Sequence, residues 1–168
     1  MIIDLTAGNR HIWGGWMPEI PELGPIIYCD IEPGLRIPPD IICDLRRLPF
    51  RSQITHAIVV DPPYWNFGTS RLHGDPQEAH GSWWGNFKNL RTLLRLLVGI
   101  VKAGRWILRP EGRLYLKWCD VVYPWKRFQS MFSWSYDEEA RLERESKSGR
   151  GKKPCYWITY RLKENSIL

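Results

Sequence analysis

The chain has 168 residues, a length typical of one domain with a full hydrophobic core. It contains no apolar run long enough to span a membrane, and its N-terminus lacks a secretory pattern, so we expect a single cytoplasmic domain over residues 1–168. The net charge of +6 favours a polyanionic partner, and the ten tryptophans suggest exposed stacking or interface surfaces in addition to the core.

The first expected strand begins at Ile2 and leads into a turn. Ile2 and Ile3 are followed by Asp4 and then by Leu5-Thr6-Ala7-Gly8-Asn9-Arg10. A glycine in such a turn lets a ligand approach the backbone closely. Glycines and prolines crowd residues 14–25, so a helix after the turn is poorly supported. A simple strand-to-loop turn is the alternative interpretation.

Two further apolar segments also end in acids. Residues 25–30 are expected to form a second strand that ends at Asp30, and residues 40–50 a third strand and its exit, with Asp44 as the acid that closes the apolar segment. Ligands bind at the carboxyl ends of strands in open α/β sheets, and an acid about twenty residues after Gly8 is placed to bond ribose hydroxyls. A single acid at such a place is commonly a helix cap, but acids that close successive apolar segments favour a ligand site.

The fourth apolar segment carries the central motif of the chain. Ile58-Val59-Val60 has the composition of a buried parallel strand, and it is followed by Asp61-Pro62-Pro63-Tyr64. Two prolines cannot continue a central strand, so Asp61 is expected to present its carboxylate at the carboxyl edge of the sheet. A strand that simply ends in a Pro-Pro turn is the alternative.

A polar stretch over residues 65–85 shows neither a helical nor a strand period. Loops of this length inside a domain tend to be functional or disordered. Its aromatic residues are candidates for stacking on a base, although a packed flap or a dimer contact explains the tryptophan pair nearly as well. These candidates are Trp65, Phe67, Trp83 and Trp84.

The second half of the chain predicts a helix over residues 86–104, a turn at 110–112, a strand at 113–118, and a short helix after Pro124. Residues 134–142 and 155–162 are expected to pair as a hairpin. A basic stripe on the long helix is either a solvated face or a track for phosphates. The hairpin loop carries the strongest phosphate-contact candidates, with a solvated tip as the alternative. These loop residues are Arg150, Lys152 and Lys153.

The four cysteines form no CxxC pair, and we expect all of them to be reduced and mostly buried. They are Cys29, Cys43, Cys119 and Cys155. No metal site is expected, because His73 and His80 share a loop without matching ligands.

In combination, Asp61-Pro62-Pro63-Tyr64, the strand, acid and glycine turn of residues 2–8, and the later acids resemble the S-adenosylmethionine-dependent amino-methyltransferases of the DPPY type. These enzymes methylate an exocyclic nitrogen of a nucleic-acid base. The resemblance extends from Ile2 to about Leu162, with Arg10 in place of the family's second glycine. It implies an α/β Rossmann-like class I methyltransferase fold, a seven-stranded, mostly parallel sheet with an antiparallel strand near the C-terminus, and S-adenosylmethionine as cofactor.

The resemblance also implies roles for single residues. Asp61 and the carbonyl of Pro62 would accept the two N–H bonds of the target amine and free its lone pair for attack on the methyl group. Pro63 completes the motif, and Tyr64 would stack on a base taken out of its helix. The cofactor would be contacted by Asp4, Thr6, Ala7, Gly8, Asp30, Ile31, Asp44, Leu45 and Asp61.

We therefore expect methyl transfer to a nucleic-acid base, with adenine N6 in DNA as the first choice and RNA as the less favoured partner. The alternatives are an RNA base methyltransferase that acts on guanine N2 or adenine N6, a protein glutamine methyltransferase, and a non-catalytic nucleic-acid-binding subunit of a methyltransferase pair. Beyond the 65–85 loop and the basic hairpin we expect no room for a separate recognition region, so that sequence preference is either short or lax, or is supplied by a homodimer or a partner subunit.

Overall fold

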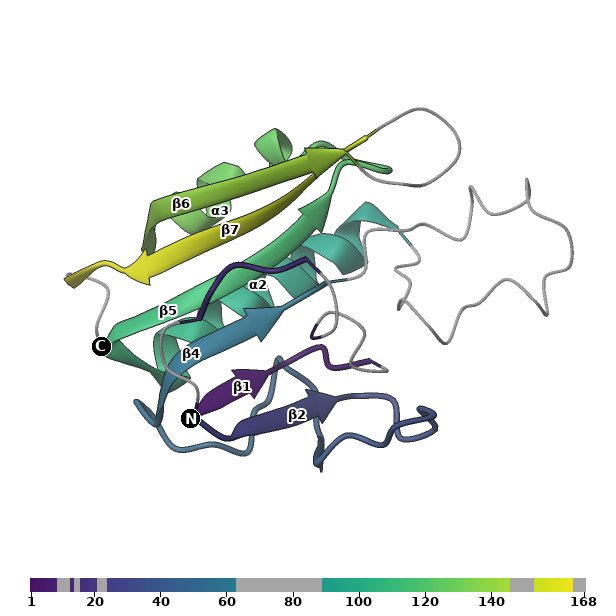
Figure 1. Ribbon diagram of the computed structural model, residues 1–168, viewed down its shortest axis with the longest axis vertical. Helices are drawn as coiled ribbons and strands as arrows, with labels where there is room; N and C mark the ends of the chain where they lie inside the picture. Colours follow the sequence, from purple (N-terminus) through teal and green to yellow (C-terminus); the bar gives the residue numbers. More distant parts are fainter. Residues whose placement is uncertain (9–12, 14–15, 21–23, 63–88, 146–152, 165–168) are drawn as a thin grey trace, which may run out of the picture.

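The computed structural model describes residues 1–8, 13, 16–20, 24–62, 89–145 and 153–164, and these residues form a seven-stranded sheet with helices packed on it (Figure 1). The strand order is β3-β2-β1-β4-β5-β7-β6. The strands are β1 (Ile2–Asp4), β2 (Ile26–Asp30), β3 (Ile41–Ile42), β4 (Thr55–Val60), β5 (Leu108–Cys119), β6 (Tyr136–Glu145) and β7 (Pro154–Leu162).

The sheet has the mixed direction expected of the fold class. β1 pairs in parallel with β2 and β4, β2 with β3, and β4 with β5, whereas β7 runs antiparallel to both β5 and β6. Six strands therefore share one direction and β7 opposes them. This confirms the predicted α/β class I methyltransferase fold, including the antiparallel strand near the C-terminus. The central strands consist of β-branched residues that are buried on both faces, as in parallel sheets generally.

The long helix α2 spans Leu90–Ile107. It begins where the Asn89 side chain accepts a hydrogen bond from the backbone N–H of Thr92, a standard N-cap. It ends three residues later than the predicted limit at Gly104 and passes directly into β5. The turn expected at residues 110–112 instead lies within β5, where the register against β4 shifts between Thr55 and Ala57.

The C-terminal part forms the predicted short helix and hairpin. A 3₁₀ turn at Trp125–Arg127 is followed by α3 (Gln129–Ser133), and the two elements direct aromatic side chains into the core. Trp118, Trp125, Phe128 and Phe132 pack edge-on or tilted against one another with ring centroids about 5 to 6 Å apart. Many of the tryptophans and phenylalanines are thus core residues.

The two faces of the sheet are covered differently. Figure 1 shows α2 and α3 on one face, where they enclose the larger hydrophobic cluster. The other face carries a smaller cluster built around Val59, Tyr115 and Trp157, and residues 16–20 cross it as an extended segment. The indole N–H of Trp157 donates to the backbone carbonyl of Trp16 and fastens this segment to β7. Residues 16–20 form neither a helix nor a strand, and residues 14–15 and 21–23 lie outside the described part of the chain.

The prediction that all four cysteines are reduced is wrong for two of them. Cys119 and Cys155 form a disulfide, whereas Cys29 and Cys43 are free. The two bonded residues are 36 positions apart in the sequence but stand directly opposite each other in the β5–β7 pair, with Cα atoms 4.0 Å apart. Their adjacency follows from the strand register, which cysteine spacing alone does not indicate.

Within the described residues, no helix combines the length and the apolarity that a membrane crossing requires.

Candidate active site

Acidic side chains gather at the carboxyl edge of the central strands. β1 and β2 end in Asp4 and Asp30, and Asp61 directly follows β4. Because parallel strands place their carboxyl ends at one edge of the sheet, these residues are neighbours. The neighbouring β5 adds Lys117, one residue beyond the pair formed by Val60 and Leu116. This edge is where the sequence predicted a ligand site.

Asp4 holds the first turn in shape from a fully buried position. One carboxylate oxygen accepts the backbone N–H of Thr6 at 3.1 Å, and the other accepts the indole N–H of Trp13 at 2.7 Å. Burial raises the pKa of Asp4 to about 7, although these two hydrogen bonds oppose the rise. Since both oxygens are engaged inside the protein, Asp4 positions the turn that follows β1.

The turn at residues 5–8 is connected to both neighbouring strands. The N–H of Gly8 donates to Asp30 Oδ2 at 2.9 Å, and the N–H of Ala7 donates to the carbonyl of Cys29. The Thr6 hydroxyl accepts the backbone N–H of Asp61 at 2.6 Å. Gly8 has a φ of 48°, a left-handed conformation that favours glycine. The turn and the start of the DPPY motif therefore form one hydrogen-bonded unit.

The predicted ribose acid is half-buried, and the residue that follows it is exposed to solvent. Asp30 accepts the N–H of Gly8 through one oxygen and the N–H of Glu32 through the other, at 3.0 Å. The next side chain, Ile31, is 62% exposed although it is a large apolar group. An acid beside an uncovered apolar side chain suits a ligand with hydroxyls attached to a flat ring.

The third predicted pair, Asp44 and Leu45, is arranged differently. Asp44 forms an ion pair with Arg46, which donates to both carboxylate oxygens and lowers the pKa of Asp44. Leu45 is buried in the core and lies against Gly99 of α2. An adenine contact by the Asp44 side chain would have to compete with Arg46.

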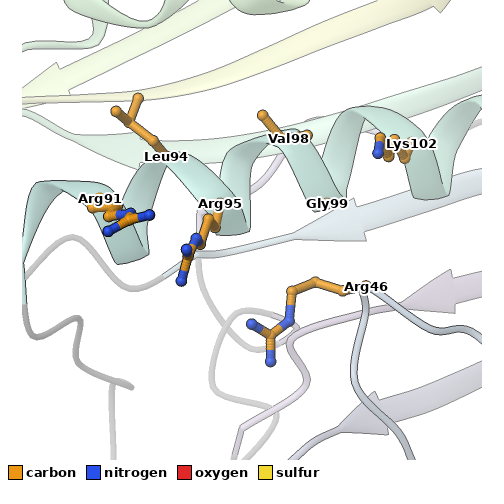
Figure 2. A pocket seen from close by; sticks show the side chains of 7 residues that line it. All are labelled: Arg46, Arg91, Leu94, Arg95, Val98, Gly99 and Lys102. Carbon is orange, nitrogen blue, oxygen red and sulfur yellow. The ribbon is translucent and has the colours of Figure 1, made fainter.

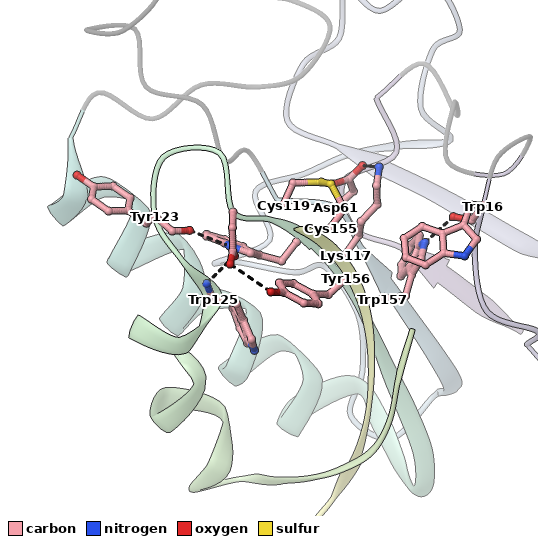
Figure 3. Close-up of a disulfide and its surroundings, with 11 residues drawn as sticks. Trp16, Asp61, Lys117, Cys119, Tyr123, Trp125, Cys155, Tyr156 and Trp157 are labelled. Carbon is pink, nitrogen blue, oxygen red and sulfur yellow. Dashed lines mark hydrogen bonds and ion pairs between the residues drawn. A yellow bond between two sulfur atoms is a disulfide. The ribbon is translucent and has the colours of Figure 1, made fainter. Parts of the chain in front are cut away.

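Asp61 and Lys117 form a buried ion pair at the centre of the site (Figure 3). Lys117 Nζ donates to Asp61 Oδ2 at 2.6 Å, and the side chains are only 12% and 8% exposed, respectively. Burial raises the pKa of Asp61, and the charge and hydrogen bond of Lys117 oppose this rise. The second oxygen, Oδ1, is buried and has no hydrogen-bond partner in the described part of the chain. A buried carboxylate oxygen without a partner is costly unless a ligand group occupies it.

Lys117 was not among the residues expected to act in the site. The signal was present, because it is a charged residue within the otherwise apolar run Leu114-Tyr115-Leu116-Lys117-Trp118. A lysine in a buried central strand needs a partner of opposite charge. The disulfide between Cys119 and Cys155 begins two residues after Lys117 on the same strand.

Several predicted site residues lie outside the described part of the chain. They are Pro63, Tyr64, Trp65, Phe67, Trp83, Trp84, Arg150 and Lys152. Of the remaining substrate and motif candidates, Pro62 is buried directly after Asp61, and Lys153 is exposed just before β7.

The fold has clear counterparts among solved structures. A protein of Bacillus halodurans with a provisional methyltransferase assignment superposes with a TM-score of 0.58 at 10% identity, over 95% of this chain and 91% of that chain. N-methyltransferase NodS of Bradyrhizobium japonicum, in complex with S-adenosyl-L-homocysteine, gives 0.54 at 12% identity, over 97% and 77%. The fold is that of the class I methyltransferases.

A third counterpart, a SAM-dependent methyltransferase of Methanosarcina mazei, gives a TM-score of 0.53 at 14% identity, over 97% of this chain and 92% of that chain. No protein-family model and no curated protein sequence matches the chain. At these identities the class I methyltransferase likeness is one of architecture, and the chemistry of the site must be argued from its own residues.

Proposed function

We propose that this protein transfers a methyl group from S-adenosylmethionine to an exocyclic amino nitrogen of a nucleic-acid base, with adenine N6 in DNA as the target. The observation that carries the proposal is the buried Asp61 at the carboxyl end of β4, which has one oxygen paired with Lys117 and the other without a partner in the described residues. Recognition of a longer sequence would come from a second copy of the chain or from a partner subunit.

The residues at the carboxyl edge fit the cofactor. Asp30 and the exposed Ile31 present a carboxylate and an apolar surface side by side, as a ribose and an adenine ring require. Gly8 adopts a conformation that leaves its backbone open to close approach. Among the solved counterparts, NodS was crystallised with S-adenosyl-L-homocysteine. Asp4, Thr6 and Ala7 would support this site by holding the turn.

When bound, S-adenosylmethionine supplies an electrophilic methyl group, so that a nitrogen–carbon bond forms while the carbon–sulfur bond breaks and leaves its electron pair on sulfur. Asp61 Oδ1 accepts a hydrogen bond from one N–H group of the target amine. The carbonyl of Pro62 accepts the other, which turns the nitrogen lone pair away from the ring. As positive charge develops on the nitrogen, the Asp61 hydrogen bond strengthens. The excess proton then leaves to water.

Lys117 serves this chemistry by favouring the ionised form of Asp61 against the effect of burial. Burial alone favours the neutral acid, which would offer a proton to the amine in place of an acceptor. The Lys117 ammonium group, hydrogen-bonded to Oδ2, offsets that tendency. It also fixes the orientation of the carboxylate plane, so that Oδ1 stays in position to accept a hydrogen bond from the substrate. Tyr64 and the aromatic residues of the 65–85 loop are the proposed stacking groups for the extruded base.

The test offers radiolabelled S-adenosylmethionine with unmethylated double-stranded DNA, single-stranded DNA, and RNA, followed by digestion and identification of the labelled nucleoside. We expect label on N6-methyladenine from DNA. Label from RNA alone would move the target to RNA, and label on protein glutamine would overturn the nucleic-acid assignment.

A matched pair of variants tests the role of Asp61. Asp61→Ala should lower kcat by at least about 10²-fold, as the removal of a transition-state contact does in other enzymes. Its affinity for the cofactor, measured by calorimetry, should be unchanged. Asp137→Ala removes an exposed acid from the distant β6 and should leave both quantities unchanged. If Asp61→Ala abolishes cofactor binding, the proposed division of roles is wrong.

A further inference from the structure

Four of the seven residues that line an open cavity beside α2 are cations. It has a volume of about 490 Å³, and Figure 2 shows its lining side chains on α2 and on the turn after β3. The lining residues are Arg46, Arg91, Leu94, Arg95, Val98, Gly99 and Lys102. We call this surface the basic groove. No described residue of its lining carries a carboxylate, and among the described residues its one ion pair is that between Asp44 and Arg46.

The three cationic residues of α2 in the basic groove lie in a row along one face of the helix. Arg91, Arg95 and Lys102 lie at positions i, i+4 and i+11, which share one face of a helix, and the row extends over roughly 16 Å at 1.5 Å per residue. All three are exposed, and none of them forms an ion pair with a described residue. A single phosphate is too small to contact the whole row, whereas a chain of phosphates matches it.

The row is unfavourable for the helix that carries it. Like charges at i and i+4 repel, and Arg91 lies in the first turn, where the helix dipole favours acids and where α2 has none. The turn after β3 adds a further cation at close range. A Cβ atom on Gly99 would lie only 2.9 Å from Arg46 Cγ and 2.8 Å from Leu45 Cδ1, so glycine is what allows this approach. Such a gathering of positive charge is expected where a polyanion binds.

The basic groove begins near the carboxyl edge of the sheet, where the candidate active site lies. The first turn of α2, which contains Arg91, lies at the end of the molecule where β4 and β5 finish (Figure 1). Arg46 is two residues beyond Asp44 at the same edge. Val98 and Leu94 give the groove an apolar floor between the cations, and Val98 is 42% exposed. Arginine and lysine over an apolar floor suit a sugar-phosphate chain.

We propose that the basic groove binds the phosphodiester backbone of the nucleic acid, flanking the base that reacts at the carboxyl edge. This inference rests on the proposed function, since it takes the substrate to be a nucleic acid. The groove fixes the position of the substrate and contributes affinity without sequence preference.

The test compares two triple variants of the full chain. Arg91→Gln/Arg95→Gln/Lys102→Gln removes the row, and Arg36→Gln/Arg51→Gln/Lys126→Gln removes the same charge from exposed positions outside the groove. Binding of a fluorescein-labelled DNA duplex, and of RNA of the same sequence, is measured by anisotropy over a salt series. The groove variant should bind at least about tenfold more weakly at physiological salt, and its slope of log K against log salt should fall by about 3, one for each lost phosphate contact. The control should stay within about twofold of the unmodified protein.

Equal losses in the two variants, or no loss in the groove variant, would overturn the proposal. So would binding of poly-L-glutamate as tight as that of the oligonucleotides, because the groove would then be a site for an acidic protein. Methyl transfer separates this outcome from failure of the proposed function. If the unmodified protein methylates DNA and the groove variant keeps its KM, the groove assignment alone fails. If the groove variant loses DNA binding but the unmodified protein transfers no methyl group, the proposed function alone fails.

Discussion

Lys117 decides the pH range in which Asp61 can accept a hydrogen bond from an amine. Burial raises the pKa of Asp61 and Lys117 lowers it, so removal of the lysine should raise this pKa further. The negative charge of Asp61 in turn contributes to the raised pKa of the buried Asp4 on the neighbouring strand β1, where burial is the largest cause.

We expect Lys117→Met to shift the acidic limb of the pH profile of kcat to higher pH. Each unit of upward shift lowers the ionised fraction of Asp61, and hence the rate, by about tenfold below the pKa. The loss should therefore be greatest at low pH and should recover as the pH rises, and Lys117→Arg should restore much of the profile. An equal loss at every pH would instead indicate a purely structural role.

Asp4 makes the stability of the fold depend on pH. Its folded-state pKa of about 7 lies above the usual value of 3.8, so the protonated acid is favoured in the folded protein. Its contribution to stability is complete below the unfolded pKa and is lost as the pH rises to about 7. The shift corresponds to a loss on the order of 4 kcal/mol.

The variant Asp4→Asn stays neutral and should lack this dependence. In urea unfolding between pH 4 and pH 8, the difference in unfolding free energy between the two proteins should change steadily in favour of the variant as the pH rises. Parallel curves would show that the pKa of Asp4 is not raised in the folded state.

At the scale of elements, the β5–β7 pair contains both Lys117 and the disulfide. The Cys119–Cys155 bond closes a loop of 36 residues, for which chain entropy predicts a stabilisation of about 4 kcal/mol. Reduction with dithiothreitol should therefore lower Tm by roughly 8 to 16 °C for a domain of this size. The double variant Cys119→Ser/Cys155→Ser should unfold at the lower temperature with or without reductant. A Tm that does not respond to reductant would contradict the stabilising role.

The elements that the sequence predicts well are those with a complete local signal. α2 combines an apolar stripe with an Asn89 cap, and β7 is rich in aromatic and β-branched residues, whereas β6 is mostly charged and exposed beyond Tyr136. The early start of β5 was not predictable, because Pro110 and Gly112 are typical turn residues and it is Leu108 and Arg113, on either side of them, that pair with Thr55 and Ala57 of β4.

At the scale of the molecule, the acids were predictable and their partners were not. Asp4, Asp30 and Asp61 each close an apolar segment, which is a local pattern. The pairing of Asp61 with Lys117 and of Cys119 with Cys155 depends on which strands become neighbours, and that is a property of sheet order. The basic row on α2 was visible in the sequence as a stripe, but its convergence with Arg46 depends on how the turn after β3 packs against Gly99.

The single hydrogen bond between the Thr6 hydroxyl and the Asp61 N–H has a thermodynamic consequence. The turn that would hold the cofactor and the residue that would hold the amine cannot move independently, so occupancy of one site should change affinity at the other. Linkage makes this effect reciprocal. We expect S-adenosylhomocysteine to increase the affinity for DNA several-fold. In the Thr6→Val variant, the ratio of DNA affinities with and without S-adenosylhomocysteine should be close to one. An unchanged factor in the variant would locate the coupling elsewhere.

Such coupling would also impose an order on the catalytic cycle. A chain whose amine acceptor is positioned fully only after its cofactor turn is filled would load the methyl donor first and capture the base second. It would release the methylated base before the demethylated donor. A base would then rarely be unstacked in a complex that lacks the methyl donor and cannot react. One threonine hydroxyl would then separate an ordered kinetic mechanism from a random one.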